Sequence, residues 1–116
     1  MLNEDCLFCK IIKGEIPSAK VYEDKKVLVF NDINPVAPVH ILIIPKEHII
    51  STNNITRENS EYMATIYEKI PEIAEKVGVK NTGYRLICNC GEDAMQEIKH
   101  LHFHLVGGKK LGANII

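Results

Sequence analysis

The stretch His100-Leu101-His102-Phe103-His104-Leu105-Val106 alternates three histidines with apolar residues. Because successive side chains of a β-strand point to opposite faces, the three imidazoles are predicted to share one face of a strand. Leu101, Phe103 and Leu105 would line the opposite face, which the pattern marks as the core side. Adjacent imidazoles suit proton transfer, nucleophilic attack or metal binding near neutral pH, whereas in a packed core each would need a hydrogen-bond partner. The alternative is a strand whose polar face is simply rich in histidine.

Length and composition indicate one globular domain over residues 1–116, with 46% hydrophobic and 25% charged residues. A net charge of -1 gives no general electrostatic basis for binding nucleic acid or an anionic membrane. Acidic residues at positions 4 and 5 stand where an export signal would be basic, and the apolar run 41–44 is too short to span a bilayer. We therefore expect a cytoplasmic protein whose cysteines remain reduced.

Apolar periodicity and turn residues predict an α+β domain. A short amphipathic helix is expected over residues 6–14, with Asp5 as its candidate N-cap and Gly14 as its stop. A long helix is expected over residues 56–77, where Pro71 should cause a kink or a break. Short connections favour antiparallel pairing, so we expect a five-stranded antiparallel sheet with the long helix packed on one face. The predicted strands cover residues 21–23, 27–30, 40–44, 84–90 and 99–106.

The four cysteines form two closely spaced pairs. Cys6-x-x-Cys9 has the spacing of half a tetrahedral zinc site, and two further ligands would be needed. The alternative is two buried thiols on a short helix. Cys88 and Cys90 would lie on one strand face, either joining the first pair in an all-thiolate site or packing in the core.

Three separated segments, taken in order, resemble the histidine triad (HIT) superfamily of nucleotide hydrolases and transferases. They are the histidine stretch of residues 100–106, the segment 30–49, and Asn89-Cys90-Gly91. Gly107-Gly108, which directly follows the histidine stretch, resembles the Hint branch and its bacterial histidine triad nucleotide-binding proteins. The resemblance covers nearly the whole chain. It implies a HIT-like fold and a homodimer.

The resemblance also implies a reaction. A purine nucleoside 5′-phosphoramidate, such as an AMP–amine or AMP–lysine conjugate, would be hydrolysed through a nucleotidyl-histidine intermediate. His102 would be the nucleophile, and His104 and His40 would contact the phosphate or the departing group. Asp32 would accept hydrogen bonds from the ribose hydroxyls, a task for which a carboxylate offers several lone pairs.

The nucleotide-binding residues implied by the resemblance have simpler readings as well. The apolar residues that match the base pocket are, taken alone, ordinary core residues: Phe8, Ile11, Phe30, Ile33 and Leu42. Asn89 matches a polar position of the active site, but a capping or turn role at a strand end fits equally. Glu97 stands where animal members carry a hydroxyl residue. It could turn away from the phosphate, contact a cationic leaving group, or be a solvated loop acid.

For Cys6 and Cys9, the resemblance supplies His48 and His100 as the remaining zinc ligands. Four protein ligands would make this zinc structural and would leave His102 and His104 free for catalysis.

Two rival functions stay open. One is a hydrolase in which histidines of the triad, together with His40, hold a catalytic zinc. The other is a nucleotide-binding regulatory protein with little turnover.

Overall fold

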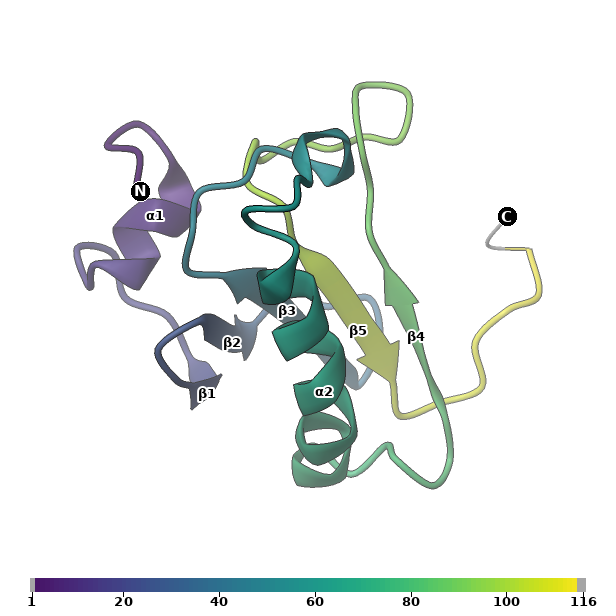
Figure 1. Ribbon diagram of the computed structural model, residues 1–116. Helices are drawn as coiled ribbons and strands as arrows, with labels where there is room; N and C mark the ends of the chain where they lie inside the picture. Colours follow the sequence, from purple (N-terminus) through teal and green to yellow (C-terminus); the bar gives the residue numbers. More distant parts are fainter. Residues whose placement is uncertain (1, 115–116) are drawn as a thin grey trace.

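The computed structural model describes residues 2–114 as five antiparallel strands in the order β1-β2-β3-β5-β4 (Figure 1). The predicted α+β class, five-stranded antiparallel sheet, short N-terminal helix and long helix are confirmed. Within the described residues, neither helix is long and apolar enough to cross a membrane. The strands are β1 (Lys20–Glu23), β2 (Val27–Asn31), β3 (Val39–Pro45), β4 (Tyr84–Ile87) and β5 (Phe103–Gly107). The helices are α1 (Leu7–Ile12), the short 3₁₀ helix η1 (Thr52–Asn54) and α2 (Glu61–Lys76).

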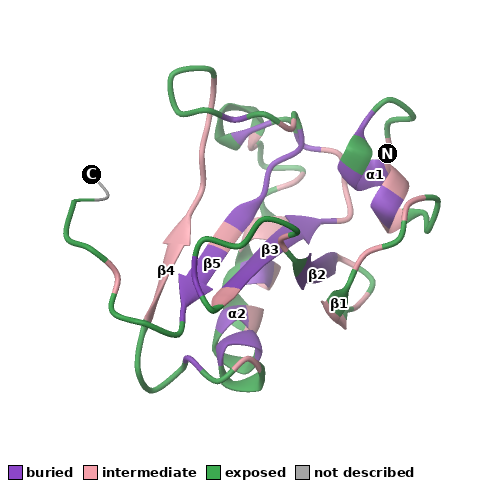
Figure 2. Ribbon diagram, turned by 180° about the vertical axis from the view of Figure 1, so that it is seen from behind, coloured by how far each residue is buried: buried purple, intermediate pink, exposed green. Residues whose placement is uncertain are grey.

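Both faces of the central strands are covered. The face toward α2 buries Val27, Val29, Ile41 and Ile43 against Ile66, Ile70 and Ile73 of the helix. The opposite face buries alternate residues of the same strands against α1, namely Leu28, Phe30, Leu42 and Ile44. Because each strand is buried on two sides, residues 27–30 and 41–44 are continuous apolar runs rather than alternating ones. Figure 2 shows this burial along β2 and β3, while β4 is only half-buried.

The long helix α2 begins later than predicted and passes through its proline. Residues 56–60 form turns, in which the Asn59 side-chain oxygen accepts a hydrogen bond from the Thr56 amide at 2.7 Å. Pro71 lies inside α2, so the predicted break is wrong. Pro71 is exposed, and its missing amide removes the hydrogen bond that the Tyr67 carbonyl would otherwise accept. The helix survives because its apolar face remains packed on the sheet.

The strands that carry the histidines and the second cysteine pair are shorter than predicted. β4 ends at Ile87, and β5 begins only at Phe103. The segment before β5 pairs with residues that follow β3, because the Leu101 amide donates to the Ile49 carbonyl at 2.6 Å.

The N-cap of α1 is also not the predicted Asp5. The Cys6 thiol caps the helix instead, accepting a hydrogen bond from the amide of Cys9 at 3.3 Å.

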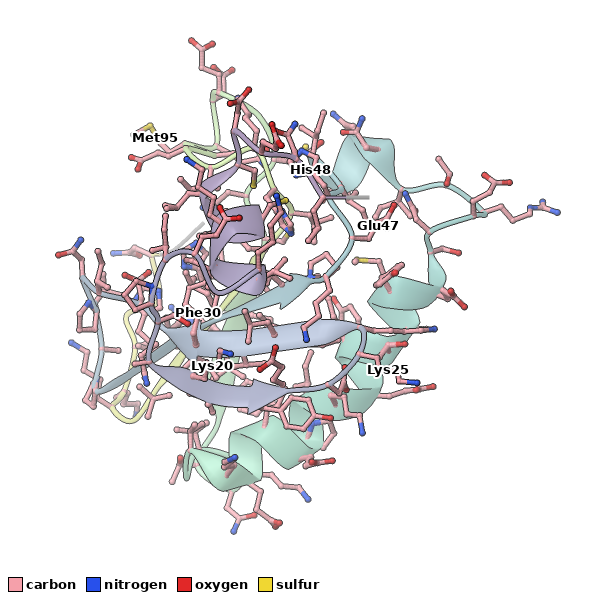
Figure 3. The ribbon with its side chains drawn as sticks, turned by 90° about the vertical axis from the view of Figure 1, so that its left-hand side faces the viewer. Lys20, Lys25, Phe30, Glu47, His48 and Met95 are labelled. Carbon is pink, nitrogen blue, oxygen red and sulfur yellow. The ribbon has the colours of Figure 1, made fainter. Side chains whose placement is uncertain are left out.

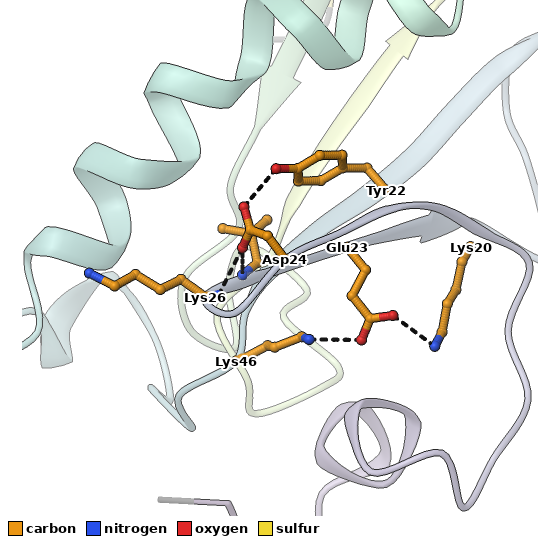
Figure 4. A network of polar contacts seen from close by, with 7 residues as sticks. Lys20, Tyr22, Glu23, Asp24, Lys26 and Lys46 are labelled. Carbon is orange, nitrogen blue, oxygen red and sulfur yellow. Dashed lines mark hydrogen bonds and ion pairs between the residues drawn. The ribbon is translucent and has the colours of Figure 1, made fainter.

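The turn between β1 and β2 is closed by Asp24 (Figure 4). One carboxylate oxygen accepts the amides of Lys26 and Val27 at 2.8 Å, and the other accepts the Tyr22 hydroxyl at 2.7 Å. Burial by itself would raise the pKa of Asp24, but these hydrogen bonds outweigh it and lower the pKa. A neighbouring ion-pair cluster joins Glu23 to Lys46 and Lys20.

We expect Pro71→Ala to stabilise the protein, because alanine restores the backbone hydrogen bond to the Tyr67 carbonyl. The free energy of unfolding should rise by about 1–2 kcal/mol, since the more flexible unfolded chain of the variant offsets part of the helix-propensity gain. Urea titration measures it, with Glu68→Ala, another exposed position of α2, as the control. A loss of stability in Pro71→Ala would show that contacts of the proline ring outweigh the restored bond.

Candidate functional site

The histidine stretch keeps its alternation although only its second half is a regular strand. Leu101, Phe103 and Leu105 are buried in the core beneath α2, as predicted. The imidazoles lie on the α1 side. The Phe8 ring meets the rings of His100 and His102 edge-on, at centroid distances of 5.8 and 5.1 Å. The ring of His104 is 5.1 Å from that of His102. A short helix and the end of a strand therefore enclose the middle histidine.

The hydrogen bonding of His102 decides which of its nitrogens is free. Its Nδ1 lies 2.7 Å from the carbonyl oxygen of His100. Because a carbonyl can only accept, Nδ1 carries the proton and the lone pair belongs to Nε2. Burial lowers the pKa of His102, so the neutral form persists near pH 7. A neutral imidazole with its second nitrogen held by an acceptor is the form a histidine nucleophile requires.

His40 and His104 form a directed hydrogen-bond chain. The amide of Val36 donates to Nδ1 of His40 at 3.1 Å, so neutral His40 carries its proton on Nε2. That Nε2 lies 2.9 Å from Nδ1 of His104 and 3.3 Å from a carboxylate oxygen of Asp32. His104 therefore accepts at Nδ1 and is left with an Nε2–H donor. Burial, with the neighbouring His102 and His40, lowers the pKa of His104.

One cavity, of about 260 Å³, opens beside α1. Its lining includes all five residues predicted for the base pocket together with Asp32: Phe8, Ile11, Phe30, Ile33 and Leu42. The side chain of Ile33 is 91% exposed, which excludes a core role for it. Figure 3 shows α1 above the strand edge, with Phe30 beneath the helix and His48 beside it. Sequence reasoning missed Pro17, Ser18 and Ala19, which also line this cavity.

A larger cavity, of about 600 Å³, is lined by His40 and His104. Asn89, which the resemblance matches to an active-site position, is among its lining residues. Arg85 of β4 and two lysines of the C-terminal segment line it as well, and sequence reasoning did not identify them. A signal was present for Arg85. Residues 85, 87 and 89 alternate, and Ile87 is the β4 partner of His104, so they face the same side of the sheet.

Glu97 does not join this site. It is exposed and lines a separate hollow with Cys6 and His48. The preceding residue, Gln96, is buried and anchors the loop by donating to the carbonyl of Ile50 at 2.7 Å. Of the predicted nucleotide-binding residues, Glu97 is therefore the one that the fold places away from both cavities.

Cys6, Cys9, His48 and His100 come together with their ligand atoms within 4.8 Å of one another. The distances from thiol sulfur to imidazole Nδ1 are 3.3, 3.4 and 3.5 Å. A tetrahedral zinc with ordinary bond lengths would hold sulfur and nitrogen about 3.5 Å apart, so the spacing fits. His100 lies with Nε2 2.9 Å from the Pro45 carbonyl, which leaves the Nδ1 lone pair facing the thiols. This donor set could hold a metal ion.

The remaining thiols are not part of this cluster. Cys88 is partly buried against the core beneath α2, 3.6 Å from the Thr52 hydroxyl. Burial raises the pKa of both Cys88 and Cys9. A metal at the cluster would therefore have to displace a proton from Cys9.

The chain resembles known proteins over most of its length. Residues 5–114 match the family described as "Scavenger mRNA decapping enzyme C-term binding". A purine nucleoside phosphoramidase of Escherichia coli K12 is 44% identical over 111 residues, which are 96% of this chain and 93% of that protein. A HIT-like protein of Buchnera aphidicola is 49% identical over 105 residues, covering 90% and 94%. A histidine triad protein from Clostridium difficile has a TM-score of 0.93 and 53% identity over 97% of both chains. A HIT family hydrolase from Clostridium thermocellum has a TM-score of 0.94 and 49% identity over 98% and 99%.

The hydrogen-bond pattern makes a spectroscopic prediction. Near neutral pH, ¹⁵N–¹H correlation spectra should show His102 protonated at Nδ1 and unprotonated at Nε2, because Nδ1 faces a carbonyl oxygen. His104 should titrate below the usual value of about 6.5 and so remain neutral into more acidic solution than an exposed histidine. A neutral His102 with its proton on Nε2 would contradict the assignment.

Proposed function

The chain belongs to the histidine triad family, and from this premise we propose that it is a purine nucleoside phosphoramidase. Such an enzyme hydrolyses the phosphorus–nitrogen bond that joins a nucleoside 5′-phosphate to an amine. The name of the Escherichia coli relative supports this reaction. The observation that carries the proposal is the free Nε2 of His102, fixed by the 2.7 Å contact of Nδ1 with the carbonyl of His100.

The cavity beside α1 is the proposed nucleoside site. Its apolar walls, which include Phe8, Phe30 and Leu42, suit a flat purine. Asp32 lies in the same lining and uses one carboxylate oxygen to accept the amide of Asn34 at 2.8 Å. Its other lone pairs are available to the two hydroxyls of a ribose. A nucleoside bound in this way would direct its 5′-phosphate toward the histidines.

The proposed chemistry has two displacements at phosphorus. Nε2 of His102 first uses its lone pair to form a nitrogen–phosphorus bond, while the bond to the leaving amine breaks. The electron pair leaves with the amine nitrogen, which takes a proton from water. A water oxygen then attacks phosphorus, loses its proton and displaces His102, so the products are the amine and the nucleoside monophosphate. The His100 carbonyl stabilises the positive charge that develops on the imidazole in the first step.

The His40–His104 pair would hold the phosphate during both displacements. The Nε2–H of His104 remains a donor after its Nδ1 has accepted from His40. A preorganised donor of this kind stabilises the negative charge that develops on a phosphate oxygen. Asp32, at 3.3 Å from Nε2 of His40, helps to orient that ring.

Replacing His102 by alanine should abolish turnover. AMP release from adenosine 5′-phosphoramidate is expected to fall by about 10³-fold or more, the scale typical of losing a covalent nucleophile. Affinity for AMP, measured by calorimetry, should change little, because the walls of the nucleoside cavity remain. Absence of release by the wild-type protein would overturn the phosphoramidase proposal and favour a nucleotide-binding regulatory protein.

We also propose that the Cys6, Cys9, His48 and His100 cluster binds a structural zinc ion. Cys9→Ser should lose the metal, measured by mass spectrometry of the purified protein. It should lower the Tm by roughly 5–10 °C, since a loss of about 1–2 kcal/mol shifts the Tm this far in a domain of this size. Cys90→Ser is the matched control and should keep both metal and Tm. Retention of zinc by Cys9→Ser would contradict the assignment.

One observation favours a second candidate function. Asp32, His40 and His104 offer ligand atoms within 4.8 Å of one another, so they form a group that could hold a catalytic metal and its activated water. Treatment with a chelator distinguishes the two mechanisms. Protein that stays folded but loses all AMP release would support the catalytic metal, whereas retained release would support attack by His102.

A further inference from the structure

We propose that the 600 Å³ cavity beyond His104 is a subsite for an anionic leaving group, so that the released amine carries a carboxylate or a phosphate. This inference rests on the proposed phosphoramidase function and specifies its substrate class. The charge of the cavity lining, its position relative to the nucleoside site, and the way the fold holds its cations support it. None of these three observations depends on the cluster of Cys6, Cys9, His48 and His100.

The cavity is lined by cations and by no carboxylate among the described residues. Arg85, Lys109 and Lys110 contribute positive charges, and Asn89 and the Nε2–H of His104 add neutral donors. The chain as a whole has 14 lysines and arginines against 15 acidic residues. The positive charge of this cavity is therefore a local concentration and does not reflect a basic protein. Within residues 2–114, neither lysine forms an ion pair.

The position of the cavity fits a leaving group. The nucleoside cavity is lined by Asp32 and Leu42, and the cationic cavity is lined by His40 and His104. Leu42 and His104 are cross-strand partners in the β3–β5 pair, so residues that line the two cavities are neighbours on one face of the sheet. In phosphoryl transfer, the attacking and leaving atoms lie roughly in line on opposite sides of phosphorus. A nucleotide seated beside α1 would thus direct the rest of its conjugate toward the cations.

The fold brings the lysines to this position through a glycine pair. Gly107 ends β5 where a β-carbon would lie 3.1 Å from the carbonyl oxygen of Gly83, and Gly108 has a φ of 88°. The chain therefore turns sharply after β5 and runs back beside β4 (Figure 1). The guanidinium of Arg85 donates a hydrogen bond to the Gly112 carbonyl, which holds the segment that carries both lysines.

This charge arrangement argues against a cationic leaving group. A lysine side chain in the cavity would place its ammonium among the charges of Arg85, Lys109 and Lys110, so repulsion would weaken binding. The Asp32 carboxylate, 3.3 Å from Nε2 of His40, lines the nucleoside cavity instead. Glu97, for which contact with a cationic leaving group was one of the expected roles, lies in a separate hollow. The charge of the cavity lining therefore favours an anionic leaving group.

The test compares four AMP phosphoramidates that differ mainly in the charge at the end of the amine. The amines are β-alanine with a carboxylate, 2-aminoethyl phosphate with a phosphate, β-alaninamide with no charge, and ethylenediamine with an ammonium. At low ionic strength, kcat/KM for the anionic members should exceed that of the neutral one by about tenfold, and the cationic member should be slowest. Added salt should reduce these differences, because it screens partly exposed charges. The carboxylate and phosphate arms show which anion is preferred.

The variant that tests the subsite is the double substitution Lys109→Glu/Lys110→Glu, which should invert the order so that ethylenediamine is favoured over β-alanine. Lys109→Gln should reduce the anionic preference without inverting it. Lys25→Glu is the matched control, because this exposed residue lies in the β1–β2 turn, outside both cavities (Figure 3). It should keep the wild-type order.

The outcomes separate this inference from the proposed function. Turnover of all four conjugates with no charge preference, or with a preference that the double substitution leaves unchanged, would overturn the anionic subsite and leave the phosphoramidase proposal intact. Absence of turnover for every conjugate would overturn the phosphoramidase proposal itself, and the subsite with it.

Discussion

The buried imidazole of His100 is the group on which the rest of the site depends. Its Nε2 donates to the carbonyl of Pro45 at the end of β3, and its Nδ1 faces the thiols of Cys6 and Cys9. Its own carbonyl accepts the Nδ1 proton of His102. The side chain is fully buried, and burial lowers its pKa to about 4, so it is neutral near pH 7. One residue thus joins the N-terminal helix, the central strand and the candidate nucleophile.

This arrangement explains how a helix as short as α1 can help to form a binding site. A helix of six residues has little stability of its own, so its position must come from tertiary contacts. Here the contacts are made by Cys6 and Cys9 with the histidine pair, and by Phe8 with the ring of Phe30 at 5.6 Å. The same helix supplies walls of the nucleoside cavity. The cluster of Cys6, Cys9, His48 and His100 therefore also helps to form the proposed nucleotide site, because it holds α1 in position.

The sequence was sufficient for the fold class because its patterns come from burial. Alternation from 100 to 106 predicted the core side correctly, and the spacing of Ile66, Ile70 and Ile73 predicted the buried face of α2. Boundaries were less predictable, because hydrogen bonds from distant residues set them. Phe103 rather than Lys99 begins β5, since the preceding segment pairs with residues after β3. Propensity also misjudged Pro71, whose effect on the helix is outweighed by packing.

The candidate site likewise has some residues that the sequence predicts and others that only the fold brings together. Residues that match a known motif could be placed in advance, whereas the cationic cavity could not, because Arg85 and Lys109 are far apart in sequence and come together only through the turn at Gly108. Alternation along β5 also has a functional consequence. Odd-numbered residues anchor the strand in the core beneath α2, so the histidines at even positions are held on the opposite face, where His102 packs against Phe8. The apolar anchor on one face thus leaves His104 on the other face at the edge of the larger cavity, next to its β3 partner Leu42 in the lining of the nucleoside cavity, as the proposed reaction between a nucleoside and its leaving group requires.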